Sequence, residues 1–184
     1  SQGDMFITCA TIAQSYLLLI TSSMIGISGG TQAILSYNYG ARRADRVKDA
    51  ERNILGVMLI FTTIMFLLSR LVPRYFVLLF TSDPQYISFS VWAIHTYTLM
   101  IIPLSFQYVF VDGLTALDRP KTGLALSVTR KSLFVLSAAI LPVFFDAKAA
   151  FFEEPVADGV CSVLSTVVFL LLINRHLQKR CQTV

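Results

Sequence analysis

Long apolar runs separated by short polar stretches divide most of the chain, and they constrain its fold more than any other feature. Their positions are about 6–37, 54–72, 84–110, 122–145 and 156–173. A hydrocarbon core about 30 Å thick is crossed by roughly 20 apolar residues in a helix. Only 14% of the residues are charged, whereas a soluble domain carries about 25%. The sequence predicts an all-α polytopic membrane protein with five transmembrane helices in a single membrane domain, 1–184.

Glycine and proline predict irregularities within these helices. Gly26, Gly29 and Gly30 lie near the middle of the first run, where low helix propensity predicts a kink. Pro103 lies inside the third run and should kink that helix, because proline lacks a backbone N–H group. Asp83 is followed directly by proline, a pattern typical of a helix N-cap.

The basic residues gather on alternate connections between the runs. Ten of the 15 lysine and arginine residues lie after the first, third and fifth runs. These are Arg42, Arg43, Arg46, Lys48, Arg52, Arg119, Lys121, Arg175, Lys179 and Arg180. Since basic loops stay inside, the carboxy terminus is expected to be cytoplasmic and Ser1 outside. Such a start, with no basic segment of a signal peptide, predicts a chain cut between spans.

Several function classes find no support in the sequence. The net charge of +4 follows from the sorting of basic loops, so no nucleic-acid partner is expected. Cys9, Cys161 and Cys181 are scattered without metal-ligand spacing, which predicts neither a disulfide framework nor a metal site. No catalytic motif is present, so an enzyme is disfavoured and no cofactor is predicted.

Ionisable residues inside a span are costly and are therefore functional candidates. Arg130 lies about eight residues, or roughly 12 Å, into the fourth run. A pathway or gating role and a structural ion pair are equally open for it, and snorkelling is the third alternative. Its expected partner is a carboxylate or a helix end. Lys131 should point about 100° away and snorkel. Asp158 follows Pro155, which favours a helix-start role, with an ion or proton site as the alternative.

Other polar residues are less specific. Asp112 precedes a glycine near the end of the third run and is typical of a solvated turn. His95 stands alone and is expected to be a packing residue. Gln32, Gln107 and Tyr108 could hydrogen-bond between helices or line a cavity. The candidate substrate or ion pathway residues are Gln32, Gln107, Asp112, Arg130 and Asp158.

Three segments resemble one known family. Residues 26–47 read GISGGTQAILSYNYGARRADRV and resemble the signature of the eighth helix in the multidrug and toxic compound extrusion (MATE) family, with Gln32 on the family's glutamine. Residues 105–136 resemble its helices ten and eleven, with Arg130 on the family's arginine. The EEPVAD segment, 153–158, resembles the start of helix twelve. Asp118 stands where the family usually has glycine.

The resemblance implies that the chain is the carboxy-terminal part of a MATE transporter, comprising helices eight to twelve of twelve. The family exports drugs and organic cations in exchange for Na⁺ or H⁺ and works as two lobes. The implied partners are membrane lipid, organic cations and the missing amino-terminal lobe. The implied location is the plasma membrane, in bacteria the inner membrane.

Two alternatives stay open at this point. One is a lipid-linked saccharide flippase of the same superfamily, which would need a more cationic cavity than Arg130 and Lys131 provide. The other is a membrane protein without transport activity, either an assembly partner or a truncated gene product.

Overall fold

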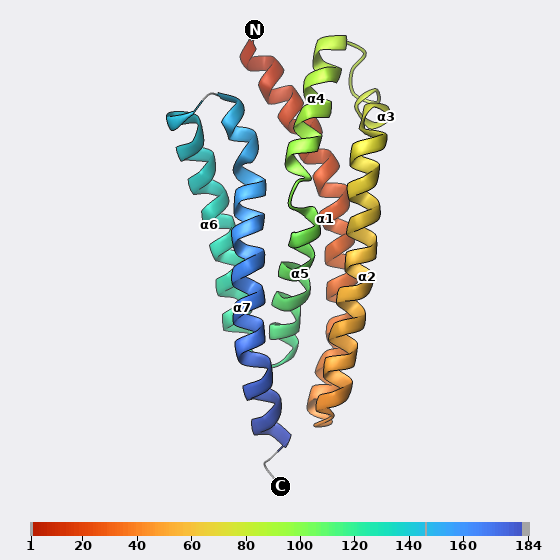
Figure 1. The fold of residues 1–184 in the computed structure, drawn as a ribbon, viewed down its shortest axis with the longest axis vertical. Helices are drawn as coiled ribbons and strands as arrows, with labels where there is room; N and C mark the ends of the chain where they lie inside the picture. Colours follow the sequence, from red (N-terminus) through yellow and green to blue (C-terminus); the bar gives the residue numbers. More distant parts are fainter. Residues whose placement is uncertain (1, 146, 182–184) are drawn as a thin grey trace.

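The computed structural model describes residues 2–145 and 147–181 as long helices standing side by side (Figure 1). The helices are α1 Gln2–Gly40, α2 Ala44–Leu71, α3 Pro73–Val77, α4 Pro84–Tyr97, α5 Ile101–Ala116, α6 Pro120–Phe144, the 3₁₀ helix η1 Ala147–Phe152, and α7 Glu153–Cys181. No strand occurs in this described part of the chain. Four of these helices are long and apolar enough to cross a membrane, and α4 and α5 pass the same test when they are taken together as one bent span. The predicted fold class is confirmed.

Helix α5 lies at the centre of the bundle and packs against α1, α2, α6 and α7. Figure 1 shows α1 and α2 on one side of α5 and α6 and α7 on the other. The N-terminus lies at one end of the bundle and the last helix ends at the other. Each of these four helices packs on a different face of α5. The position of a polar residue on α5 therefore decides which of the four helices it contacts.

The two predicted kinks have different outcomes. Helix α1 is a single helix through the glycine stretch, with no break. A Cβ atom at Gly26, Gly29 or Gly30 would meet nothing within 4 Å. The described chain therefore makes no close helix contact that requires these glycines. The third span, in contrast, is interrupted between α4 and α5 with a bend of 45°.

The interruption of the third span follows from Pro103. A proline cannot donate a hydrogen bond to the carbonyl group four residues earlier, and its ring clashes with that group. That carbonyl group belongs to Leu99, which lies in the gap between the two helices. Hydroxyl groups hold α2 against this third span: Ser69 Oγ lies 3.0 Å from Oγ1 of Thr98 in the gap, and Thr62 Oγ1 lies 2.8 Å from Ser105 Oγ of α5.

Several helix ends differ from their predicted positions. The Asp83 side chain accepts a 2.8 Å hydrogen bond from the Gln85 N–H group, which confirms the predicted N-cap. Helix α2, however, begins at Ala44, ten residues before the predicted span. Helix α7 begins at Glu153 instead of at 156. Polar residues near a membrane surface continue these helices beyond the apolar runs, because helical hydrogen bonding does not require apolar side chains.

The α5–α6 connection contains a strained residue at Asp118. Its φ is 64°, in the left-handed region. The Arg119 N–H group donates a 2.9 Å hydrogen bond to the Leu114 carbonyl group, the six-to-one bond of a Schellman helix end, where glycine is preferred.

Replacing Asp118 with glycine should therefore stabilise the protein. A left-handed conformation costs an L-residue roughly 1–2 kcal/mol, less for Asp than for most, so D118G should raise the free energy of unfolding by up to about 1 kcal/mol. Thermal unfolding followed by circular dichroism in detergent measures the gain. The D118A variant keeps a Cβ atom and serves as the control; an equal gain in D118A would contradict the backbone explanation.

Candidate functional site

A cavity of about 240 Å³, lined in part by polar and charged side chains, lies between α1, α5 and α6. Its lining residues are Ile25, Gln107, Tyr108, Val111, Asp112, Ser127, Arg130 and Lys131. Three of the predicted site residues are among them. The remaining two bond directly to members of this lining, Gln32 to Asp112 and Asp158 to Arg130. The fold therefore brings all five predicted residues into one region of the bundle.

Arg130 is held from the side facing α7. Its Nε atom donates a 2.7 Å hydrogen bond to Asp158 Oδ1, and its Nη2 atom lies 3.4 Å from Glu154 Oε2. The side chains of Asp158 and Glu154 are 1% and 5% exposed and that of Arg130 is 12% exposed. Arg130 thus has the expected carboxylate partner and also borders the cavity, so a structural ion pair and a pathway role are compatible for it.

Asp158 does not have the helix-start role that its sequence position favours. Helix α7 begins at Glu153, so Asp158 lies in its second turn, beyond the free N–H groups of the first turn. Its Oδ1 atom accepts the bond from Arg130, while its Oδ2 atom is buried with no hydrogen-bond partner in the described chain. Helix α7 follows η1 without a break, so its first residue is Glu153, before Pro155.

Asp112 is not a turn residue either. Helix α5 continues to Ala116, so Asp112 lies inside the helix one turn before its end. The side chain is half-buried, and its Oδ1 atom accepts a 3.0 Å hydrogen bond from Gln32 Nε2. The local pattern was misleading because the glycine at position 113 serves a helix contact and not a turn.

The bond between Gln32 and Asp112 belongs to a regular series between α1 and α5. Ser28 Oγ donates to the Tyr108 carbonyl group at 3.2 Å, and Ser36 Oγ donates to the Ala116 carbonyl group at 3.3 Å. On each helix the bonded residues are four positions apart, so they lie on one face. This series fixes the register of the two helices and places Asp112 at the cavity.

Two further lining residues affect the polarity of the cavity. Gln107 is 4% exposed, and its Oε1 atom has no hydrogen-bond partner in the described chain. Lys131, which is expected to snorkel, is exposed and lines this cavity and two adjacent hollows. Its Nζ atom lies 5.4 Å from the centre of the Phe134 ring. The cavity therefore has positive charge on its α6 wall and negative charge at Asp112.

Glu51 was not singled out from the sequence, although its carboxyl group interacts electrostatically with Asp112. It lies among the charged residues that were assigned to a connecting loop. The spacing of apolar residues around Glu51 could have identified it as buried. Val47, Ile54 and Met58 lie on the same face of α2 as Glu51, and all four residues are buried. Those spacings of three and four residues mark the face of a helix that packs inward.

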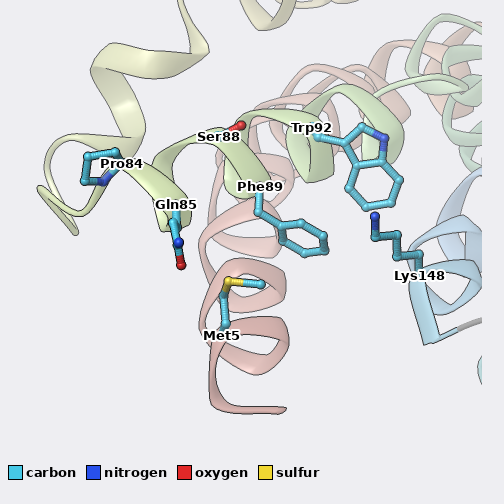
Figure 2. A pocket seen from close by; sticks show the side chains of 7 residues that line it. All are labelled: Met5, Pro84, Gln85, Ser88, Phe89, Trp92 and Lys148. Carbon is cyan, nitrogen blue, oxygen red and sulfur yellow. The ribbon is translucent and has the colours of Figure 1, made fainter. Parts of the chain in front are cut away.

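A larger hollow of about 710 Å³ lies at the end of the bundle where the chain begins. Figure 2 shows Phe89 and Trp92 of α4 beside Met5 of α1, with Lys148 pointing toward the Trp92 ring. None of the five predicted site residues lines this hollow. It is therefore separate from the cavity at Asp112.

Comparisons with known proteins agree on one family. The MatE family model matches residues 1–141. The chain is 26% identical over 136 residues to a protein of Shewanella oneidensis strain MR-1 named FAD transporter, a match that spans 74% of this chain and 29% of that protein.

Solved structures show the same fold. A MATE structure in the bent conformation has a TM-score of 0.87 with 14% identity and covers 96% of this chain and 39% of its own. An inward-facing multidrug resistance MATE transporter has a TM-score of 0.84 with 14% identity and covers 98% of this chain and 44% of its own. The chain thus spans less than half the length of these relatives.

The bent third span, the all-helical membrane fold and the family match over residues 1–141 point to the same conclusion. The chain belongs to the MatE family of multi-pass membrane transporters.

Proposed function

We propose that the protein containing this chain is a secondary active antiporter, which exports drugs or other organic cations in exchange for Na⁺ or H⁺. The observation that supports this most directly is the cavity within the bundle that has the carboxylate of Asp112 on its wall. A half-buried carboxylate in an apolar bundle can bind either a small cation or an organic cation. If only one of them is bound at a time, entry of the ion displaces the compound, which is the basis of exchange.

The proposal includes the location of the protein and the part of it that this chain represents. The carboxy terminus is placed in the cytoplasm of a bacterium and the helices in its inner membrane, on the basis of the basic connections. The chain covers 29% of the length of the Shewanella relative and 39–44% of the solved transporters. An amino-terminal lobe is therefore the proposed partner, and transport is assigned to the two lobes together.

Gradient-driven transport in vesicles tests this function. Membrane vesicles from cells that produce the native protein are given a Na⁺ gradient or a pH gradient, and movement of a fluorescent organic cation is followed. One of the gradients should drive the cation against its own gradient, and an ionophore that removes the ion gradient should stop it. Movement that responds to neither gradient would exclude antiport.

An anionic substrate is the second candidate, and Lys131 favours it. The positive charge of Arg130 is compensated by Asp158 and Glu154, whereas the Lys131 ammonium group lies beside a phenyl ring at the cavity. The relative from Shewanella is named for FAD, a compound with two phosphate groups. The same vesicles given a flavin nucleotide decide between the candidates: transport of the nucleotide and not of the cation would replace the first proposal with the second.

A further inference from the structure

Glu51 lies near the start of α2, at the contact between α2 and α5. Helix α2 begins at the end of the bundle opposite the N-terminus (Figure 1). It is 5% exposed, although it follows a strongly charged stretch of the chain. Its carboxyl group lies directly against Gly113, where an added Cβ atom would overlap Glu51 Oε1. Glycine at position 113 thus leaves the space in which this carboxyl group is buried.

No cation compensates this carboxyl group in the described part of the chain. Its Oε1 atom is buried and has no hydrogen-bond partner there. On its own helix, Lys48 and Arg52 are exposed. Helix α5 presents Asp112, whose carboxyl group interacts with that of Glu51.

Among the side chains that the structure describes, the other neighbours of α2 do not supply a compensating charge either. Helix α1 contributes the neutral Gln32, which bonds to Asp112, and the buried phenol Tyr39. Helices α3 and α4 meet the far end of α2, where Arg70 and His95 lie. Between Asp158 and Ile173, α7 has no charged residue.

Burial beside a second carboxylate favours a neutral glutamic acid. An ionised carboxylate that loses water without gaining a cation or donors is strongly disfavoured. Two neighbouring carboxyl groups cannot both be ionised at low cost, so a proton on one of them lowers the cost of burying the pair. Asp112 has a donor in Gln32, so it is the better placed of the two to carry the negative charge.

We propose that Glu51 and Asp112 form one proton-binding site at the α2–α5 contact, with the proton on Glu51 while these helices are packed together. This inference rests on the antiport function proposed above and specifies H⁺ as its coupling ion. When the inner ends of α2 and α5 separate, water reaches Glu51, the proton passes to water, and the resulting carboxylate repels Asp112. Packing and proton release are thereby linked, because the ionised pair opposes closure.

Infrared spectroscopy of the native protein in lipid tests the site without any substrate. The wild type at neutral pH should show the carbonyl stretching band of a protonated carboxylic acid, and E51Q should lack it. E51Q replaces a neutral acid by a neutral amide of the same shape, so folding should be preserved. The matched control is D49N, since Asp49 is an exposed acid on the same helix, and its band should equal that of the wild type. A wild type without the band, or a band unchanged in E51Q, would overturn the inference.

Transport by the same variants separates this inference from the proposed function. In E51Q, exchange driven by a pH gradient should fall by about 5- to 150-fold, the range of typical coupling between two sites, while D49N should keep the wild-type rate. If no ion gradient drives transport in the wild type, the antiport function fails whatever the infrared result. If a pH gradient drives transport equally well in E51Q, or only a Na⁺ gradient drives it, antiport stands and the proton site is wrong.

Discussion

Replacing Arg130 with alanine should lower the free energy of unfolding by about 3–5 kcal/mol, the effect typical of removing one partner from a buried ion pair. The substitution leaves Asp158 and Glu154 buried without their cation, at 1% and 5% side-chain exposure. Unfolding in mixed detergent micelles, followed by circular dichroism, measures the loss. The neighbouring substitution K131A is the control, because Lys131 is exposed and an exposed substitution changes stability by about 0.5 kcal/mol or less.

A compensated variant shows whether the uncompensated carboxylates cause this loss. In the triple variant R130M/E154Q/D158N the buried charges are removed together and the space stays filled, so much of the lost stability should return. If the triple variant is as unstable as R130A, the destabilisation comes from lost packing of the long side chain and the electrostatic explanation is wrong. Wild-type stability in R130A itself would show that the α6–α7 ion pair contributes little.

Replacing Asp112 with asparagine should abolish ion-driven transport while preserving the fold. The side-chain oxygen of asparagine can still accept the bond from Gln32, so the α1–α5 contact remains. The negative charge on the cavity wall is lost. The ion and the organic cation then no longer compete for the carboxylate at position 112, so ion entry no longer displaces the compound. We expect the initial rate of gradient-driven efflux to fall by about 100-fold, near the upper end of typical coupling energies.

The control for this substitution is D118N, which changes an exposed aspartate six positions later, in the connection between α5 and α6. Asparagine tolerates the left-handed conformation at that position, so transport and stability should be unchanged. Efflux in D112N at the wild-type rate, with the same dependence on the ion gradient, would show that Asp112 does not couple the ion. The cavity would then need a different role.

The sequence predicted the spans well because the signal is a bulk property. Crossing a bilayer requires a long apolar segment whatever its neighbours are, so each run could be recognised on its own. Pro103 is a similar case, since the missing N–H group acts on the carbonyl group four residues earlier within the same helix. The N-cap at Asp83 also needs only local groups.

The errors lie where a residue's role depends on another helix. Asp112 has the local pattern of a turn, and only the register of α1 against α5 shows that it faces Gln32 and the cavity. Glu51 has the local pattern of a charged loop, and only its contact with Gly113 reveals its burial. The start of α2 differs from the start of the predicted span because the span was defined by apolar residues alone. The helix itself also includes the polar residues that precede the apolar run.

The sequence by itself therefore determined the class of protein, its long apolar segments and which ionisable residues are costly in a membrane. Only the tertiary structure decided how they combine: Arg130 with Asp158 and Glu154, Asp112 with Gln32, and Glu51 beside Asp112. The physical reason is the range of the forces involved. The free energy of transferring apolar residues into lipid is a sum over the residues of one helix, so it can be read from the sequence. A hydrogen bond or ion pair requires two atoms about 3 Å apart, and the packing and register of separate helices set that distance.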